Sequence, residues 1–174
     1  MIKERWEKML YKSKYASPLG NLLILADNSS VLGLWFEDQK YYGASYSLEE
    51  AVYQENRVIK KVKEWLSDYF DGRKPAKEHL SLAPKVTDFR QKVLSILQTV
   101  PYGQTITYQQ ILDKLKENYG ENVGSARAVG GAVGHNPISI IIPCHRVIGS
   151  DGSLTGYAGG IERKLKLLTL EDIR

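Results

Sequence analysis

Residues 140–149, IIIPCHRVIG, contain the only cysteine of the chain, and a histidine and an arginine follow it directly. A cysteine thiolate is a strong nucleophile, and a nearby histidine or arginine favours it over the thiol, whose free pKa is about 8.5. Pro143 cannot donate to a sheet ladder, so the isoleucine segment must end or bulge there. The polar pair His145 and Arg146 then indicates that the chain has reached a surface or a cleft. Cys144 is therefore a candidate nucleophile.

The alternative is an inert, buried thiol, because free cysteine commonly packs as a small apolar side chain. Adjacent residues on an extended chain point to opposite faces. We therefore expect His145 to reach Cys144 through a water or a turn rather than by direct contact. The other histidines, His79 and His135, form no cluster that predicts a metal site. The local sequence leaves the reactive and the inert interpretations of Cys144 open.

The composition of the 174-residue chain is that of a globular protein, with 43% hydrophobic and 25% charged residues. Its length allows one domain of ordinary size or two small ones. The N-terminal residues lack the apolar run of a secretory signal, and no segment approaches the ~18 apolar residues of a membrane span. A single cysteine cannot form an internal disulfide, so we expect a cytoplasmic protein. The net charge of +4 is compatible with a nucleic-acid partner but does not require one.

The first half of the chain predicts strands followed by a helix. Residues 48–72 carry apolar side chains at helical spacing, beginning with Val52, and end at a glycine. Residues 72–87 contain two prolines and no periodic pattern, so we place a domain boundary there. The strands are predicted at residues 9–16, 22–26 and 31–37.

The second half predicts mainly helices. Thr87 and Ser125 are suitable N-caps, and Thr107 with Gln110 fits a capping box. The two helices that begin after Thr107 and Ser125 resemble a helix-turn-helix. After them we predict a buried strand at residues 137–142, a small hairpin at 146–156 and a closing helix at 161–172.

The helix after Ser125 is unusually rich in alanine and glycine, and a glycine inside a helix costs about 1 kcal/mol against alanine. Gly130 and Gly131 are explained either by close packing against another helix or by close approach to a ligand such as a DNA phosphate. Arg127 is either simply solvated or placed to reach a DNA groove. The glycines lack the spacing of phosphate-binding loops, so a nucleotide-binding enzyme is not supported.

Longer stretches around these residues resemble a known family. PCHRVIGSDGSLTGYAGG is similar to the active-site signature of the O6-alkylguanine-DNA alkyltransferases, also called methylated-DNA–protein-cysteine methyltransferases. The resemblance extends through VPYGQTITYQQI, ARAVGGAVGHNPISIIIPCHR and GGIERKLKLLTLE, and so covers essentially all of residues 86–171. ASPLGNLLILADN resembles the N-terminal domain of the same family less specifically.

The resemblance implies an α+β fold. Residues 1–80 would form a ribonuclease-H-like domain, with a three-stranded antiparallel sheet and a helix. Residues 86–174 would form a mostly helical, winged-helix-like domain that carries the helix-turn-helix, the DNA-binding surface and the alkyltransferase site.

The resemblance also implies the reaction. Such proteins bind duplex DNA in the minor groove and rotate a damaged guanine out of the stack. A cysteine thiolate then takes the alkyl group from O6-alkylguanine, or less readily from O4-alkylthymine, and keeps it as a thioether. Each molecule acts once. We therefore expect double-stranded DNA containing O6-alkylguanine as the partner, a monomer, no membrane association and no cofactor.

Carried over to this sequence, the resemblance makes Cys144 the nucleophile and alkyl acceptor. His145 would take the thiol proton through a water, and Glu171 would orient His145 and stabilise its charged form. Asn136 would hold the active-site loop to the end of the second helix of the helix-turn-helix. Some relatives bind a structural zinc through N-terminal cysteines, which this chain lacks, so we predict no metal.

The resemblance assigns a second group of residues to the base and the DNA. Tyr108 would donate to the guanine N3, Tyr157 would line the base pocket, and the backbone N–H of Ala158 would face O6. Some family members carry serine at the last position, where a backbone donor would serve equally well. Arg127 would fill the gap left by the extruded base. Small residues would let the helix approach the groove closely: Ala126, Ala128, Gly130 and Gly131.

Two other functions compete with the alkyltransferase. A DNA-binding module without enzymatic activity would bind lesions or duplex DNA and transfer nothing. A cysteine hydrolase with a Cys-His-Glu set would turn over repeatedly. One alkyl group transferred per protein molecule, with no further reaction, separates the alkyltransferase from both.

Overall fold

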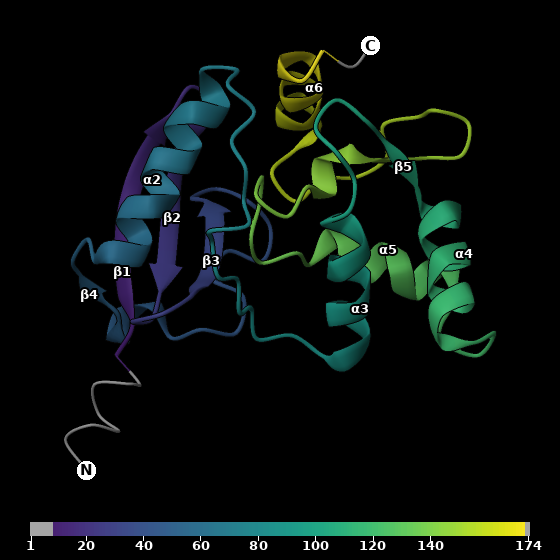
Figure 1. Cartoon of the computed structure of the whole chain (residues 1–174), viewed down its shortest axis with the longest axis horizontal. Coiled ribbons are helices and arrows are strands. Elements are labelled where there is room, and N and C mark those ends of the chain that lie inside the picture. The colour runs from purple at the N-terminus through teal and green to yellow at the C-terminus, as the bar shows by residue number, and fades with distance from the viewer. Residues whose placement is uncertain (1–8, 173–174) are drawn as a thin grey trace. The chain divides into compact units, whose positions relative to one another are not determined.

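The computed structural model describes residues 9–172 and divides the chain after Lys85 into two compact units. The first is a small sheet with a helix, and the second is mainly helical (Figure 1). The predicted α+β class is therefore confirmed. No helix within residues 9–172 combines the length and the apolar character needed to cross a membrane.

The sheet of the first unit contains the three predicted strands and a fourth. Its order is β3-β2-β1-β4; the β1–β2 and β2–β3 pairs are antiparallel, whereas β4 lies parallel to β1. The sheet is therefore mixed, where we expected a purely antiparallel one. Its strands are β1 (Tyr11–Ser17), β2 (Gly20–Ala26), β3 (Val31–Phe36) and β4 (Val52–Tyr53).

The helix predicted at residues 48–72 begins only at Arg57, so the first part of that prediction is wrong. Val52, which we placed on the apolar face of the helix, lies on the short edge strand, where its N–H donates to the carbonyl of Leu10 at 2.9 Å. Asn56 caps the helix with its side chain, which accepts from the N–H of Ile59, whereas the side chain of Ser47, before the predicted start, makes no such bond. The segment before the cap forms a 3-10 turn, η1 (Leu48–Glu50), and the helix is α2 (Arg57–Phe70).

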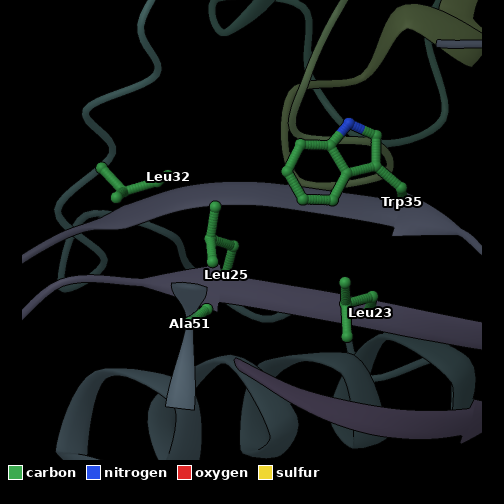
Figure 2. Packing of buried hydrophobic residues seen from close by; sticks show 5 residues of the cluster. All are labelled: Leu23, Leu25, Leu32, Trp35 and Ala51. Carbon is green, nitrogen blue, oxygen red and sulfur yellow. The ribbon is translucent and has the colours of Figure 1, made fainter. Parts of the chain in front are cut away.

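Apolar side chains cover both faces of strand β2, as expected for a strand that reads as a continuous hydrophobic run. On one face, Leu23 and Leu25 pack with Trp35 and Ala51 (Figure 2). The Trp35 ring occupies the space that a Cβ on Gly33 would need. Helix α2 packs against the sheet with its buried side chains, which are Ile59, Val62, Trp65, Leu66 and Tyr69.

The second unit contains the predicted helices with their predicted caps. The Thr87 and Ser125 side chains each accept a hydrogen bond from the first turn of their helix, and Thr107 with Gln110 forms the capping box. These local signals are therefore confirmed. The helices are α3 (Asp88–Leu97), α4 (Tyr108–Tyr119), α5 (Ala126–Gly134) and α6 (Ile161–Leu170).

The predicted hairpin at residues 146–156 is wrong. Strand β6 (Val147–Ile148) pairs in parallel with β5 (Ile106–Thr107), which directly precedes α4. Gly149 then donates to the carbonyl of Ser153 at 2.9 Å and closes a turn, but no returning strand follows within the described residues. The pairing places the residues next to Cys144 against the first turn of the helix-turn-helix.

Candidate active site

Residues 137–142 are buried but form turns, so the strand predicted there is wrong. Ile140 has a φ of 70°, and the N–H of Ile141 donates to the carbonyl of Ser139 at 2.8 Å, which closes a three-residue turn. A second such turn follows, because Cys144 donates to the carbonyl of Ile142 at 2.8 Å. The segment runs from one proline to another, and neither can donate to a sheet ladder. Cys144 therefore stands at the end of a compact turn rather than on a strand.

Asn136 supplies hydrogen bonds that a sheet would otherwise have provided. Its Oδ1 accepts from the N–H of Ile138 at 3.0 Å, and its Nδ2 donates to the carbonyl of Ile142 at 2.8 Å and more weakly to that of Ile138. The side chain is buried and follows directly after α5. Asn136 thus joins the end of α5 to the turn that carries Cys144.

Cys144 begins a short 3-10 turn, η2 (Cys144–Arg146), and is only 6% exposed. Burial raises the pKa of its thiol, while a side-chain hydrogen bond from Asn136 and the positive charge of Lys164 act in the opposite direction. The resting side chain is therefore a thiol, and its ionisation needs a group that accepts the proton.

His145 is fully buried, and its Nε2 lies 2.5 Å from Oε2 of Glu171. Burial lowers the pKa of His145, against the opposing effects of the hydrogen bond and the charge of Glu171. A carboxylate only accepts hydrogen bonds, so the neutral imidazole carries its proton on Nε2 and a lone pair on Nδ1. Within residues 9–172, Nδ1 has no hydrogen-bond partner and thus makes no direct bond to the Cys144 thiol.

Arg146 was noted in the sequence only as a sign of a surface or cleft, but it is buried and contacts the same carboxylate as His145. Its Nε donates to Oε1 of Glu171 at 2.7 Å, and its Nη1 donates to the carbonyl of Val100 at 2.7 Å. The N–H of Gly103 also donates to Oε1, at 3.1 Å. Each oxygen of Glu171 therefore has a separate set of donors.

The sequence interpretation missed Lys164, whose side chain is fully buried on α6. Its Nζ donates to the carbonyl of Val147 at 2.5 Å and to those of Thr155 and Gly156 at 3.0 and 3.2 Å. Lys164 therefore ties the loop before α6 to the strand that follows Cys144. A signal existed, because Lys164 lies at i, i+3 and i+4 spacing with two buried leucines of the same helix.

The loop that Lys164 holds carries two of the predicted pocket residues. The hydroxyl of Tyr157 is buried, and the pKa of that side chain lies well above its usual value because of burial and then the charge of Cys144. Tyr157 is therefore a neutral hydroxyl close to the thiol. Ala158 is half-buried beside it. Tyr108, the first residue of α4, reaches the same loop, with its hydroxyl 3.4 Å from the carbonyl of Thr155.

The predicted DNA-contacting residues lie outside this cluster, on the exposed side of α5. Arg127, Ala126 and Ala128 are exposed, and a Cβ built on Gly130 or Gly131 would meet no atom within 4 Å. Close packing against another helix therefore does not explain these glycines. The opposite side of α5 is buried through Val129, Ala132 and Val133.

Comparison with known proteins places the chain in one family. Residues 10–84 match the ribonuclease-like domain of 6-O-methylguanine DNA methyltransferase, and residues 88–173 match its DNA binding domain. The chain belongs to the 6-O-methylguanine DNA methyltransferase family. The resemblance found in the sequence is thus confirmed over nearly the whole chain.

Individual relatives agree with this assignment. A methylated-DNA–protein-cysteine methyltransferase of Haemophilus influenzae is 40% identical and covers 94% of this chain and 87% of its own length. The O6-methylguanine methyltransferase of Mycobacterium tuberculosis, known from a crystal structure, is 38% identical, with a TM-score of 0.77 over 94% of this chain and 93% of that one. The Mycobacterium tuberculosis protein in complex with DNA gives a TM-score of 0.79, with 92% of each chain covered.

Proposed function

We propose that this protein repairs alkylated DNA by moving the alkyl group of O6-alkylguanine, and less readily of O4-alkylthymine, onto Sγ of Cys144. The observation that carries the proposal is a buried thiol followed by a neutral imidazole bonded to a buried carboxylate, in a member of this methyltransferase family. The named relatives are methylated-DNA–protein-cysteine methyltransferases.

The proposed reaction begins with loss of the thiol proton. His145 Nδ1, which carries the lone pair, accepts this proton through a bridging water, and Glu171 stabilises the imidazolium that forms. The thiolate attacks the alkyl carbon, so a carbon–sulfur bond forms while the bond from carbon to O6 breaks. The bonding electron pair stays on guanine, which takes a proton from the Tyr108 hydroxyl. The imidazolium of His145 then gives up the proton that it took from Cys144, and through solvent this proton restores the Tyr108 hydroxyl.

The product is a thioether, which water does not hydrolyse near neutral pH. Nothing restores the thiol, so one protein molecule removes one alkyl group and no cofactor takes part. In this scheme the Tyr157 hydroxyl, buried beside Cys144, lines the base pocket, and the backbone N–H of Ala158 faces O6. Asn136 holds the turn in place during the reaction.

DNA binding is assigned to the helix-turn-helix of α4 and α5. A thiol that is 6% exposed cannot reach a base inside a duplex, so the damaged guanine must rotate out of the stack. The exposed small residues of α5 allow close approach to the minor groove, and Arg127 fills the gap that the base leaves. We assign the protein to the cytoplasm and expect a monomer on double-stranded DNA.

A mass measurement tests this function. The protein is incubated with duplex DNA that contains one O6-methylguanine, and its peptides are then weighed. We expect one added methyl group on the peptide with Cys144, in a ratio of one per protein molecule. An unmodified Cys144 after prolonged incubation would leave a DNA-binding module as the function. Repeated turnover would indicate a hydrolase.

A further inference from the structure

The Glu171 carboxylate lies in a place that is unfavourable for a negative charge. It is the C-cap of α6, where the partial negative charge of the helix end opposes a carboxylate, and it is only 2% exposed. A buried carboxylate in such a place needs a positive partner or takes up a proton. Two side chains contact it as potential partners, His145 through Oε2 and Arg146 through Oε1.

His145 and Arg146 differ in how they can neutralise the charge of Glu171. If His145 alone had to neutralise Glu171, the imidazole would bind its second proton in the resting protein and could not accept another. Arg146 is permanently charged and removes that requirement. With the guanidinium present, the Glu171–His145 pair needs no additional proton. His145 can then stay neutral, with its lone pair on Nδ1.

The contacts of Arg146 also fix the carboxylate in space. One nitrogen of the guanidinium holds Oε1 of Glu171 while another holds the carbonyl of Val100, each at 2.7 Å. Gly103 adds its N–H to the same oxygen, in a backbone conformation with φ of 81°. The hydroxyl of Tyr102 donates to the carbonyl of Leu170, next to Glu171, at 3.1 Å. The carboxylate is therefore anchored to the turn after α3 independently of His145.

We infer that Arg146 is a positioning residue for the transfer reaction: it holds Glu171 through the oxygen that His145 does not use and supplies the charge that leaves His145 free to accept a proton. The inference rests on the proposed function, in which His145 takes the proton of Cys144. Arg146 touches neither the thiol nor the base in this scheme; it acts by holding Glu171 and by the effect of its charge on the pKa of His145.

Other charged and titratable groups face the same pair and must be considered. Lys164 from α6 acts on His145 in the same direction as Arg146, although its ammonium is bonded to carbonyl oxygens elsewhere. Tyr102 from the turn after α3 feels the charges of Glu171 and Asp172. Cys144 lies beside His145 on the same turn. Of these groups, only Arg146 both carries a permanent charge and bonds to the Glu171 carboxylate.

The test measures the rate of methyl transfer from O6-methylguanine duplex as a function of pH in the full-length protein and in Arg146→Met. Loss of the cation makes the Glu171–His145 pair bind a proton at higher pH, because the buried carboxylate then lacks the permanent positive charge of Arg146. We expect the acid-side midpoint of the rate profile to rise by about one pH unit. The titration of the His145 ring, followed by NMR, should move by the same amount.

Two further variants control the result. Arg73→Met removes an arginine whose side chain is 70% exposed and pairs with Asp68 at the surface, and it should leave the midpoint unchanged. Arg146→Lys keeps the charge but cannot bridge Glu171 and Val100 with a planar fork. Arg146→Lys should keep the wild-type midpoint of the pH–rate profile. Its plateau rate of methyl transfer should fall about tenfold, which corresponds to one weakened hydrogen bond to a charged group.

The outcomes are distinct. A purely structural role for Arg146 would lower the rate of Arg146→Met at every pH without moving the midpoint, and that result would overturn the inference. If Arg146→Met does not fold, Arg146→Lys decides, and a plateau equal to wild type would contradict the positioning role. If wild-type Cys144 accepts no methyl group, the proposed function fails, while the NMR titration of His145 still tests the action of Arg146.

Discussion

The exposed side of α5 and the turn at residues 136–146 are neighbours in the chain but are built in opposite ways. Arg127 is the one large side chain on the exposed side. Ala126 and Ala128 beside it are exposed, and a Cβ added at Gly130 or Gly131 would meet no atom within 4 Å. The turn, in contrast, is buried, and Asn136, His145 and Arg146 are held by specific hydrogen bonds. One region leaves space for a partner, and the other is closed around a thiol.

We therefore expect the two regions to respond to mutation in different ways. Removing a buried polar partner leaves other groups unsatisfied, so loss of a hydrogen-bonded side chain at the turn affects stability and chemistry together. Changes on the open side of α5 remove no internal contact, so they should weaken the action on duplex DNA without destabilising the protein. Four substitutions test this contrast. Three lie in the two regions, and the fourth changes Lys164, which binds the carbonyl of Val147 directly after the turn.

Cys144→Ser should abolish methyl transfer while leaving the fold and DNA binding intact. The hydroxyl is close in size to the thiol but is a far weaker nucleophile near neutral pH. Mass analysis after incubation with O6-methylguanine duplex measures the transfer, and fluorescence anisotropy with the same duplex measures binding. Methyl transfer at the wild-type rate in this variant would refute the assignment of the nucleophile.

Arg127→Ala should slow transfer from duplex DNA by tenfold or more, because extruding a base costs a few kcal/mol that the arginine helps to offset. Transfer from the free base O6-methylguanine should change much less, and the melting temperature should not change. Single-turnover rates on the two substrates give the comparison. Equal losses on both would exclude a role in extruding the base.

Lys164→Met should destabilise the protein by about 1–3 kcal/mol, because the carbonyls that the ammonium binds are left unpaired. It should also raise the pKa of Cys144, since Lys164 lowers it in the wild type. Denaturant unfolding and the pH dependence of thiol alkylation by iodoacetamide measure the two effects. Lys166→Met is the matched control on the exposed side of the same helix, and a similar effect there would contradict a specific role for Lys164.

Gly131→Ala should stabilise the protein by roughly 0.5–1 kcal/mol, because alanine is the better helix former and its Cβ meets nothing. The same methyl group should slow transfer from duplex DNA by obstructing close approach of the groove. Thermal unfolding measures the gain in stability, and the rate of methyl transfer from duplex DNA measures the loss of function. Gly120→Ala is the control: its φ of 102° makes alanine unfavourable, so that variant should lose stability. An unchanged duplex rate in Gly131→Ala would break the contrast between the two regions.

Helix starts could be predicted from the sequence because their signals are local. Thr87, Thr107 and Ser125 each bond to a backbone N–H a few residues further along, and the side-chain type reveals the position. The start of α2 was misplaced because apolar spacing over residues 48–56 imitated a helix while Asn56 set the true start. The apolar pattern alone did not show that Val52 pairs with the first strand.

The candidate site was predictable in its residues but not in its construction. An apolar run of isoleucines indicates burial, yet whether it forms a strand depends on the turn at Ile140 and on the bonds from Asn136, which no periodicity reveals. Lys164 and Arg146 bind backbone carbonyl oxygens of residues that are distant in the sequence. Lys164 binds those of Val147 and Thr155, and Arg146 binds that of Val100. Backbone acceptors carry no side-chain signal, so these contacts became visible only in three dimensions.

The side-chain bonds of Asn136 have a consequence for measurement in the unmodified protein. The amide protons of Ile138, Ile142 and Cys144 are all bonded to acceptors between Asn136 and Ile142. Their exchange with deuterated solvent therefore reports how often the turn opens, separately from unfolding of the helices. We expect exchange at these three amides to be faster than in α3 and to slow when duplex DNA binds. The exchange rate would then measure how often the site opens in the unmutated protein.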